Sequence, residues 1–453
     1  MDESSKRHLL DKDRQFVWHP FTQMKDYAEK DHLLIEKADG VFLYDADGNR
    51  YYDTISSWWV NVHGHGHPRI KRAIAGQLDS MDHVMFSGLT HPTGIELAEK
   101  LTEIVPAGLS HVFYSDNGST AVEVAVKMSF QYWQQIGEKQ KTKFVFLENS
   151  YHGDTIGAVS VGGVEMYHSL FKPLLFDAYR IPSPNVHIWP DQTEQGADAC
   201  VKRALNEAEK LFREKHGEIA AVIVEPMIQA AGGMIIYPAE YLRRLRELCT
   251  RYRIHLIADE VAVGFGRTGR MFGCNHAGIS PDLICLSKGL TAGVIPLAAT
   301  LCTDEIYMAF YDDYETLKTF FHGHSFTGNP VAAAVALESL SIFNDERVLE
   351  RVQETSAVLS ERLRRLESHE HAGRIRSLGM VGAFDLLADK SSGRSFDSRE
   401  RTGNKVYWEG LKEGLILRPL GDTIYFWLPL AVTSEQVIDI TERTERVLHR
   451  MRL

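Results

Sequence analysis

The feature that most restricts the fold of this chain is an alternation of short apolar runs with segments of helical periodicity. Continuous apolar runs of this length indicate strands that are buried on both faces, and helices between them indicate parallel connections. The runs are HVFYSD (111–116), KFVFLEN (143–149), AAVIVEP (220–226), IHLIADE (254–260), DLICLSK (282–288) and PLAATLCT (296–303). We therefore predict an α/β fold with a mostly parallel sheet between layers of helices.

The length of the chain leaves room for a second domain. At 453 residues the chain is long for a single core. The alternating pattern accounts for residues 71–330, and it is followed by charged helical segments and shorter strand candidates. We predict a large α/β domain over residues 71–330 and a smaller α+β domain built from residues 1–70 and 331–453.

The composition excludes several classes of protein. With 50 Lys and Arg against 61 Asp and Glu, the net charge is −11, which argues against a nucleic acid or an anionic membrane as partner. The five cysteines are odd in number and form no C-x-x-C pair, so we expect neither a disulfide framework nor a structural zinc site. The N-terminal residues are charged and no apolar run is long enough to span a bilayer, so we expect a cytoplasmic protein.

A glycine pattern raises the possibility of a dinucleotide site. Residues 264–269 fit G-x-G-x-x-G and follow the apolar run 254–260. Such a site needs a helix directly after the glycines, yet residues 270–282 are interrupted by glycine and proline. Asp259 and Glu260 at the strand end would also repel a diphosphate. An NAD-dependent dehydrogenase is therefore only a remote alternative.

Two charged residues end neighbouring apolar runs, where ligands gather in open α/β sheets. Asp259 either forms an ion pair, for example with Arg267, or contacts a cationic ligand atom. Lys288 ends the next run, and a lysine that loses hydration has a lowered pKa and readily forms a Schiff base. Together they suggest pyridoxal phosphate, because the lysine can hold the aldehyde while the acid keeps the pyridine nitrogen protonated.

Other stretches supply what such a cofactor would also need. Gly118 and Ser119 open a predicted helix after a strand, which is either an anion site or an ordinary N-cap. Tyr151 follows the run 143–149 and could lie on the face of the cofactor, or it could be a packed loop aromatic. Residues 321–328 offer hydroxyls and a glycine before a helix, again as an anion site or a cap.

A few further residues have a functional and a structural interpretation. Arg418 lies between apolar segments and could bind a substrate carboxylate or form an internal ion pair. Trp58 belongs either to the core or to the wall of an apolar channel. The alternating His63, His65 and His67 have no accompanying cysteine or carboxylate ligands, so we interpret HGHGHP as a glycine-rich turn and expect no metal.

Taken together, these motifs resemble those of the class III aminotransferases, which are pyridoxal-phosphate enzymes of fold type I. The resemblance runs nearly from end to end, and DEVAVGFGRTG with the downstream lysine is specific for the class. WHPFTQM and SSWW narrow it to the members that act in biotin biosynthesis. The matching segments are WHPFTQMKDY (18–27), SSWWVNVHGHGHP (56–68), SDNGSTAVEVAVKMSFQYW (115–133), YHGDTIGAVSVG (151–162), DEVAVGFGRTG (259–269), LSKGLTAG (286–293), HGHSFTGNP (322–330) and LRPLGDTIYF (417–426).

The resemblance implies a cofactor role for each matching position. Lys288 would be the catalytic amine, Asp259 would bind the pyridine nitrogen, and Tyr151 would stack on the ring. Gly118 and Ser119 would hold the phosphate. His324 and Ser325 would complete the phosphate site from the neighbouring subunit of an obligate homodimer.

The resemblance also implies an activity. Biotin-pathway members convert 8-amino-7-oxononanoate to 7,8-diaminononanoate, with S-adenosylmethionine or lysine as amino donor. The alternative within the class is a transaminase that acts on ω-amino acids, ornithine or 4-aminobutyrate. Phe21 replaces a tyrosine of many relatives, which leaves the donor open, and Val263 and Ser325 each replace a threonine. The positions implied for substrate contact are Phe21, Trp58, Tyr151, Gly323 and Arg418.

Overall fold

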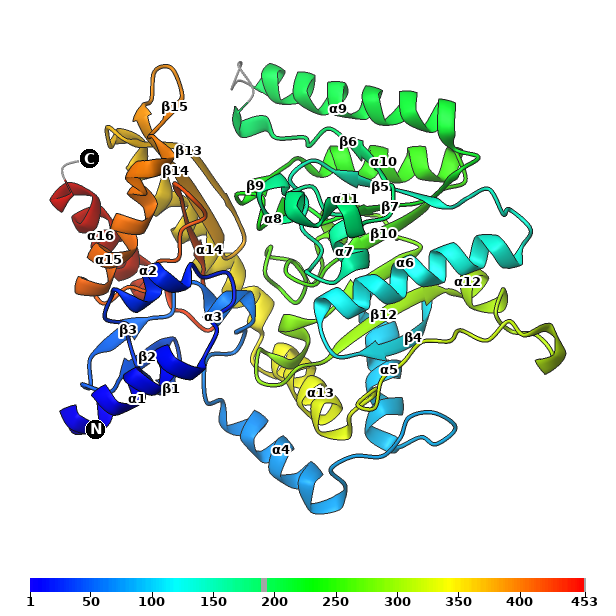
Figure 1. Ribbon diagram of the computed structural model, residues 1–453, viewed down its shortest axis with the longest axis horizontal. Coiled ribbons are helices and arrows are strands. Elements are labelled where there is room, and N and C mark those ends of the chain that lie inside the picture. Colours follow the sequence, from blue (N-terminus) through cyan, green and yellow to red (C-terminus); the bar gives the residue numbers. More distant parts are fainter. Residues whose placement is uncertain (189–193, 452–453) are drawn as a thin grey trace.

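The computed structural model describes residues 1–188 and 194–451, and its centre is a seven-stranded sheet (Figure 1). Four of the six strand pairings are parallel, and only β12 runs antiparallel to both of its neighbours. The predicted mostly parallel sheet is thus confirmed. In spatial order the strands are β4 (Leu109–Ser115), β12 (Ala298–Thr303), β11 (Leu283–Leu286), β10 (His255–Asp259), β7 (Ile219–Val224), β5 (Lys143–Leu147) and β6 (Tyr179–Ile181).

Helices cover both faces of this sheet, which explains why its strands read as continuous apolar runs. Every residue of β7, β10 and β11 is buried. No helix in the described part of the chain is both long enough and apolar enough to cross a membrane. The helices of this region are α4 (Pro68–Ser80), α5 (Pro92–Ile104), α6 (Gly118–Gln135), α7 (Ile156–Ser160), α8 (Glu165–His168), α9 (Glu194–Lys215), α10 (Ala239–Arg251), α11 (Cys274–Ala277), α12 (Asp304–Met308) and α13 (Pro330–Asp345).

The last quarter of the chain builds a smaller antiparallel sheet. In it β14 pairs with β13, β15 and β16, and helices pack beside it. A separate short hairpin of β8 (Ile228–Gln229) and β9 (Ile235–Ile236) lies in sequence between β7 and β10 of the central sheet. The elements are α14 (Val348–Arg365), β13 (Ala372–Leu378), β14 (Val381–Asp389), β15 (Arg394–Ser395), α15 (Thr402–Lys412), β16 (Thr423–Trp427) and α16 (Ser434–Arg450).

The N-terminal segment lies against this C-terminal part, as Figure 1 shows by the blue ribbon beside the orange and red ones. Tyr52 N–H donates to Gly414 at 2.8 Å, and Ile416 N–H donates to Tyr52 at 3.1 Å. The domain boundaries at residues 70 and 330 stay a prediction. The N-terminal elements are α1 (Glu3–Phe16), α2 (Met24–Ala28), β1 (Ile35–Asp39), β2 (Phe42–Asp45), β3 (Arg50–Tyr52) and the single turn α3 (Ser56–Trp59).

The glycine pattern 264–269 has a structural role in this fold. The next helix is only the four-residue α11, so no long helix follows the glycines. Arg267 is 2% exposed and donates to the carbonyl of Asn61 at 3.0 Å and to that of Leu428. Its guanidinium also lies 5.3 Å from the ring centre of Trp427. Arg267 thereby joins the segment after β10 to both the N-terminal and the C-terminal parts of the chain.

We expect Arg267→Lys to lower the free energy of unfolding by about 2 kcal/mol, because a single ammonium cannot reach both carbonyls that the guanidinium fork satisfies. Urea unfolding followed by circular dichroism measures this change. Arg270→Lys is the matched control, since Arg270 is exposed in the same loop and its replacement should change stability by less than about 0.5 kcal/mol. Equal unfolding midpoints for both variants would contradict the linking role.

Candidate active site

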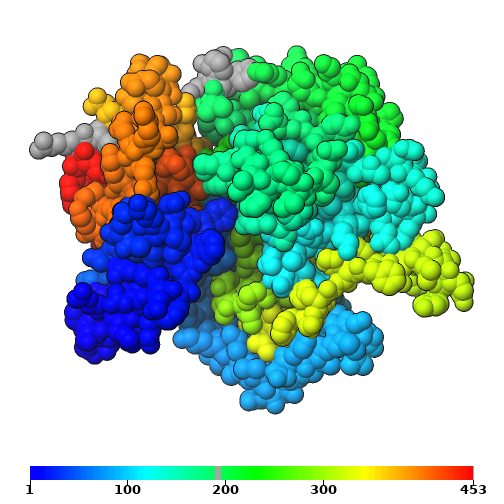
Figure 2. Space-filling view, in the orientation of Figure 1, coloured from blue at the N-terminus to red at the C-terminus, as the bar shows by residue number. Residues whose placement is uncertain are grey.

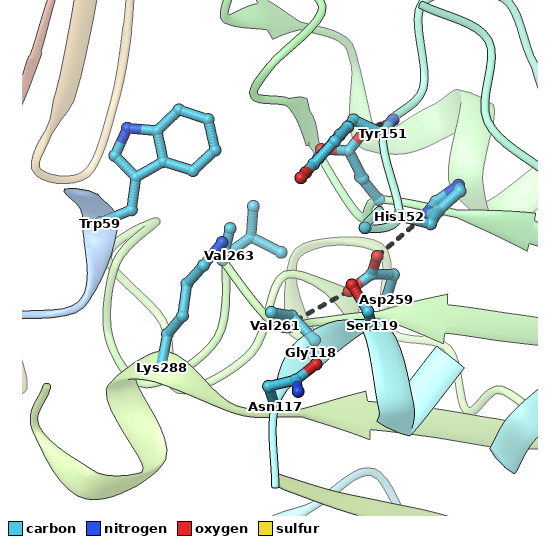
Figure 3. Close-up of a pocket in the computed structure, with 13 residues that line it drawn as sticks. Trp59, Asn117, Gly118, Ser119, Tyr151, His152, Asp259, Val261, Val263 and Lys288 are labelled. Atoms are coloured by element: carbon cyan, nitrogen blue, oxygen red, sulfur yellow. Dashed lines mark hydrogen bonds and ion pairs between the residues drawn. The ribbon is translucent and has the colours of Figure 1, made fainter. Parts of the chain in front are cut away.

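Three charged side chains meet at the carboxyl edge of the central sheet. Asp259 is the last residue of β10, while Glu225 directly follows β7 and Lys288 lies two residues after β11. In the sheet Ala258 pairs with Val224, so Asp259 and Glu225 occupy adjacent strand ends. All three side chains line one cavity of about 180 Å³ (Figure 3). The parallel arrangement therefore brings together residues that are far apart in the sequence.

Asp259 is held by a histidine that sequence reasoning missed. Its Oδ2 lies 2.7 Å from Nδ1 of His152, and its Oδ1 accepts a hydrogen bond from Val261 N–H at 3.1 Å (Figure 3). Both side chains are buried, and Nε2 of His152 has no hydrogen-bond partner in the described part of the chain. The ion pair with Arg267 that we considered for Asp259 is absent from the described contacts, because Arg267 bonds to backbone carbonyls instead. The carboxylate of Asp259 is thus fixed at the floor of the cavity.

Lys288 directs an amine into the same cavity. It opens a 3₁₀ turn, Lys288–Thr291, and its Nζ lies 4.9 Å from the ring centre of Trp59 (Figure 3). Loss of hydration lowers the pKa of Lys288, although the charges of Asp259 and Glu225 oppose this effect. A lysine with a lowered pKa has more of its amine in the neutral, nucleophilic form. The side chain can therefore react with an aldehyde or accept a proton.

The start of α6 forms a cradle that suits an anion. Asn117 caps the helix by accepting from Thr120 N–H at 3.1 Å, which leaves Gly118 and Ser119 in the first turn with amides directed out of the helix. The structure accordingly has both the cap and the candidate anion site that we considered. A Cβ on Gly118 would lie 2.5 Å from Val261 Cγ1, and one on Gly153 would lie 1.9 Å from Ser119 Oγ. The cradle is closely packed and requires glycine at both positions.

Glu225 is a second residue that sequence reasoning missed. One carboxylate oxygen accepts from Tyr151 N–H at 3.0 Å and the other from Ala230 N–H at 2.9 Å. Burial raises the pKa of Glu225 to about 7. The hydroxyl of Tyr151 donates to Asp154 at 2.8 Å, so both ends of this tyrosine are fixed. The available signal was the position of Glu225 at the end of an apolar run, the same signal that identified Asp259.

A second, larger cavity of about 470 Å³ adjoins the first and shares Trp59, Tyr151 and Lys288 with it. The guanidinium of Arg418 lies 4.5 Å from the ring centre of Trp58 in this outer cavity. No described carboxylate forms an ion pair with Arg418, whereas the carboxylate of Asp154 also lines the cavity. Phe21 packs edge to face on Trp58 at 5.7 Å. The outer cavity is thus lined by two basic side chains, Arg418 and Lys288, by the carboxylate of Asp154 and by aromatic walls.

Three of the predicted site residues do not reach either cavity. Gly323, His324 and Ser325 belong to the segment between α12 and α13. Part of this segment projects from the molecule, as the yellow-green chain in Figures 1 and 2 shows. Phe321 and Phe326 in this loop are 76% and 64% exposed. His324 Nε2 lies 3.9 Å from Asp116, just before the cap of α6. A contribution of this loop to the site of a neighbouring subunit stays a prediction.

The histidines of HGHGHP turn toward different partners. His63, His65 and His67 contact Ser339, Asp53 and Glu346, respectively. No group of three histidine, cysteine or acidic side chains in residues 1–188 and 194–451 is arranged to hold a metal ion. The segment behaves as a turn whose side chains link separate elements.

The residues of the inner cavity fit a ligand of a particular kind. Lys288 offers an amine for an aldehyde, and Asp259 offers a carboxylate for a protonated ring nitrogen. The first turn of α6 offers amides for a phosphate. Two observations support this fit. The buried His152 holds the carboxylate of Asp259 in place. A Cβ at Gly118 or Gly153 would collide with neighbouring side chains, so the first turn of α6 is closely packed.

Comparison with known proteins gives consistent similarities over the whole chain. The family described as aminotransferase class-III matches residues 24–448. An adenosylmethionine-8-amino-7-oxononanoate aminotransferase of Geobacter sulfurreducens is 45% identical over 449 residues, 99% of either chain. The crystal structure of the enzyme of that name from Methanocaldococcus jannaschii has a TM-score of 0.92 at 39% identity and covers 98% of this chain and 99% of its own.

An amine transaminase from an uncultivated Pseudomonas species, solved with pyridoxal phosphate bound, has a TM-score of 0.90 at 35% identity and covers 96% of this chain and 98% of its own. These structures confirm the predicted α/β class and fold type I. Since the family match spans nearly the whole sequence and the relatives share more than a third of their residues with it, the chain belongs to the class III aminotransferases.

Proposed function

We propose that this protein is a pyridoxal-phosphate-dependent aminotransferase that converts 8-amino-7-oxononanoate to 7,8-diaminononanoate in biotin biosynthesis. The observation that carries the proposal is the pairing of Lys288 and Asp259 in the inner cavity with an adjoining cavity that contains Arg418. The names of the most similar relatives support the choice of substrate. They also name adenosylmethionine, which we propose as the amino donor, with lysine as the alternative.

We assign the cofactor to the inner cavity. When bound, pyridoxal phosphate withdraws electrons from the carbon that carries the transferred nitrogen, so that this carbon can lose a proton. Asp259 holds a proton on the ring nitrogen, and His152 keeps the carboxylate of Asp259 in place. Gly118 and Ser119 would bind the phosphate, and Tyr151 would contact the ring.

Lys288 performs the proton transfers in this proposal. Nζ of Lys288 would hold the bound cofactor until the donor amine takes its place, and the freed lysine amine would then remove the proton from the carbon that bears the nitrogen. The same Nζ would return the proton one position away, and water would then release the donor's carbon skeleton as a carbonyl compound and leave the amino group with the cofactor. A lowered pKa suits this role, because the amine must be neutral to accept the proton and charged to give it back.

The outer cavity suits the proposed substrate in charge and in shape. The oxo acid carries a carboxylate at one end, and an amine beside its ketone at the other, with an apolar chain between them. Arg418 can bind the carboxylate, and Asp154 can attract the amine. Phe21 and Trp58 supply apolar walls for the chain between them.

We also propose that the protein acts as a homodimer. The loop with Gly323, His324 and Ser325 projects from the single chain and carries exposed aromatic residues. In a dimer this loop would bring a glycine, an imidazole and a hydroxyl to the anion cradle and substrate cavity of the partner. The two cavities would then be complete only in the assembled protein.

The first test follows the two halves of the reaction separately by absorbance. We expect S-adenosylmethionine or lysine to bleach the yellow purified protein, and 8-amino-7-oxononanoate to restore the colour. The donor that bleaches the protein is then the amino donor. If only another amine bleaches the protein, and 2-oxoglutarate or pyruvate restores the colour, the protein is instead an ω-amino acid, ornithine or 4-aminobutyrate transaminase.

Lys288→Ala is the decisive control for this test. We expect this variant to bind the cofactor without a covalent bond, so that dialysis removes the cofactor. We also expect it to give no multiple turnover. Lys100→Ala removes a partly exposed lysine on α5, which lines neither cavity, and should leave both half-reactions unchanged. Normal turnover by Lys288→Ala would remove the lysine from the mechanism.

Arg418→Gln should weaken binding of the oxo acid, because the substrate carboxylate loses its charged partner. We expect KM to rise by about 100-fold with a smaller change in kcat. Steady-state kinetics with the oxo acid measures this, and a ketone that lacks the carboxylate serves as the matched substrate, for which the variant and the native protein should not differ. An equal loss with both ketones would contradict a role in carboxylate binding.

The lowered pKa of Lys288 makes a prediction for the cofactor-free protein. Only the neutral amine attacks an aldehyde, so a lower pKa gives a larger reactive fraction at neutral pH. The rate constant for cofactor capture, followed by stopped-flow absorbance, should rise with pH and level off below 10.5, the ordinary value for lysine. For a blocked lysine peptide, the control, this rate constant should keep rising until the pH reaches that value. The same pH profile for the peptide and the protein would contradict the prediction.

A further inference from the structure

Four consecutive residues beside the active site have a left-handed backbone. The φ angles of Ser56, Ser57, Trp58 and Trp59 are 50°, 45°, 71° and 73°, and none of these residues is glycine. Trp59 N–H donates to Ile55 and Val60 N–H donates to Ser56, both at 2.9 Å, so the residues form one hydrogen-bonded turn. Each non-glycine residue in this conformation is strained, and such a turn persists only where the surroundings hold it.

Asp53 is the residue that holds the turn. Its Oδ1 accepts from Ser57 N–H at 2.8 Å, and its Oδ2 accepts from Ser57 Oγ at 2.7 Å. The same Oδ2 lies 2.9 Å from Nε2 of His65. Asp53 is 1% exposed, so these contacts are formed away from water, where each is worth more than at the surface.

Two contacts to the C-terminal sheet fix the ends of the turn. Ser56 Oγ donates to the carbonyl of Trp427 at 2.5 Å, and Trp59 Nε1 donates to the hydroxyl of Tyr425 at 3.2 Å. Both acceptors belong to β16. The turn is therefore tied to Asp53 from one side and to a strand of the small sheet from the other.

The turn presents two adjacent tryptophans to two different parts of the site. Trp59 lies over Nζ of Lys288 at 4.9 Å, and Trp58 lies over the guanidinium of Arg418 at 4.5 Å. Ser57 itself lines the outer cavity, whereas Asp53 lines neither cavity. A change of the turn toward an unstrained backbone would move both rings away from the charged groups that they cover.

We propose that Asp53 is a positioning residue of the active site: it holds the left-handed turn, and through the turn it sets Trp58 and Trp59 against Arg418 and Lys288. The inference rests on the proposed function for its link to substrate binding. Asp53 acts through Ser57 and touches neither the cofactor site nor the substrate site.

Hydrogen–deuterium exchange of the cofactor-free protein tests whether Asp53 holds the turn. Asp53→Asn retains the size of the side chain but replaces one acceptor oxygen by an NH2 group, so it cannot accept both from Ser57 N–H with one atom and from Ser57 Oγ with the other. We expect the peptide 54–62 to exchange about tenfold faster in this variant. Asp45→Asn is the matched control, because Asp45 is also buried and accepts from Tyr51 and Asn49 but lines neither cavity.

Kinetics and a rescue variant test whether the turn acts on substrate binding. Asp53→Asn should raise KM for the oxo acid about tenfold with a smaller change in kcat, whereas Asp45→Asn should change neither. Ser57→Gly added to Asp53→Asn should recover part of the loss, because glycine adopts this backbone without strain. If Asp53 only stabilised the fold, Asp53→Asn would lower Tm without raising KM. Ser57→Gly would then have no change in KM to reverse.

The outcomes separate the inference from the proposed function. Exchange of 54–62 that is the same in Asp53→Asn and Asp45→Asn, or an unchanged KM in an active Asp53→Asn protein, would overturn the inference while the proposed function stands. A native protein that transfers no amino group, yet whose peptide 54–62 is protected by Asp53, would overturn the proposed function and with it the link to substrate, but not the role of Asp53 in holding the turn.

Discussion

The removal of charged groups from water at the carboxyl edge of the central sheet is the constraint on which the rest of this structure depends. Lys288, Asp259 and Glu225 line one cavity, and an isolated charge in such a place is costly. Each is compensated in a different way: Asp259 by His152 and a backbone amide, Glu225 by two backbone amides, and Lys288 by the two acids and the face of Trp59. These compensating groups fix the loops that form the cavity walls.

The loops around the cavity can be explained from this requirement. Tyr151 is held because its amide satisfies Glu225, and its hydroxyl is held by Asp154. The segment after β7 is held because Ala230 donates to the same carboxylate. Glu225 accepts hydrogen bonds from two loops at once, those of Tyr151 and Ala230. It therefore couples the position of the Tyr151 ring to that of the segment after β7, which forms part of the wall of the outer cavity. Glu225 contributes to the site through positioning even though it was not recognised from the sequence.

The parts of the site that could be predicted are those in which chemistry depends on local pattern. Asp259 and Lys288 end apolar runs, and Gly118 opens a helix after another run, so the topology of a parallel sheet was enough to bring them together. The pairings of His152 with Asp259 and of Glu225 with Tyr151 depend on strand register and loop geometry, which periodicity does not specify. The proposed contribution of His324 and Ser325 illustrates the opposite limit, because a site shared between two chains would not be formed within one.

The left-handed turn was beyond prediction for a different reason. Residues 56–59 read SSWW, and neither serine nor tryptophan favours positive φ, so local propensity argues against the backbone that the structure has. The conformation is imposed by Asp53 from the same segment and by β16 from the far end of the chain. The large sheet thus places the acids and the lysine at the strand ends, whereas the positions of Trp58 and Trp59 depend on contacts between the two ends of the sequence. Substitutions in the N-terminal or C-terminal part can consequently alter which substrate fits while the reacting groups at the sheet edge stay in place.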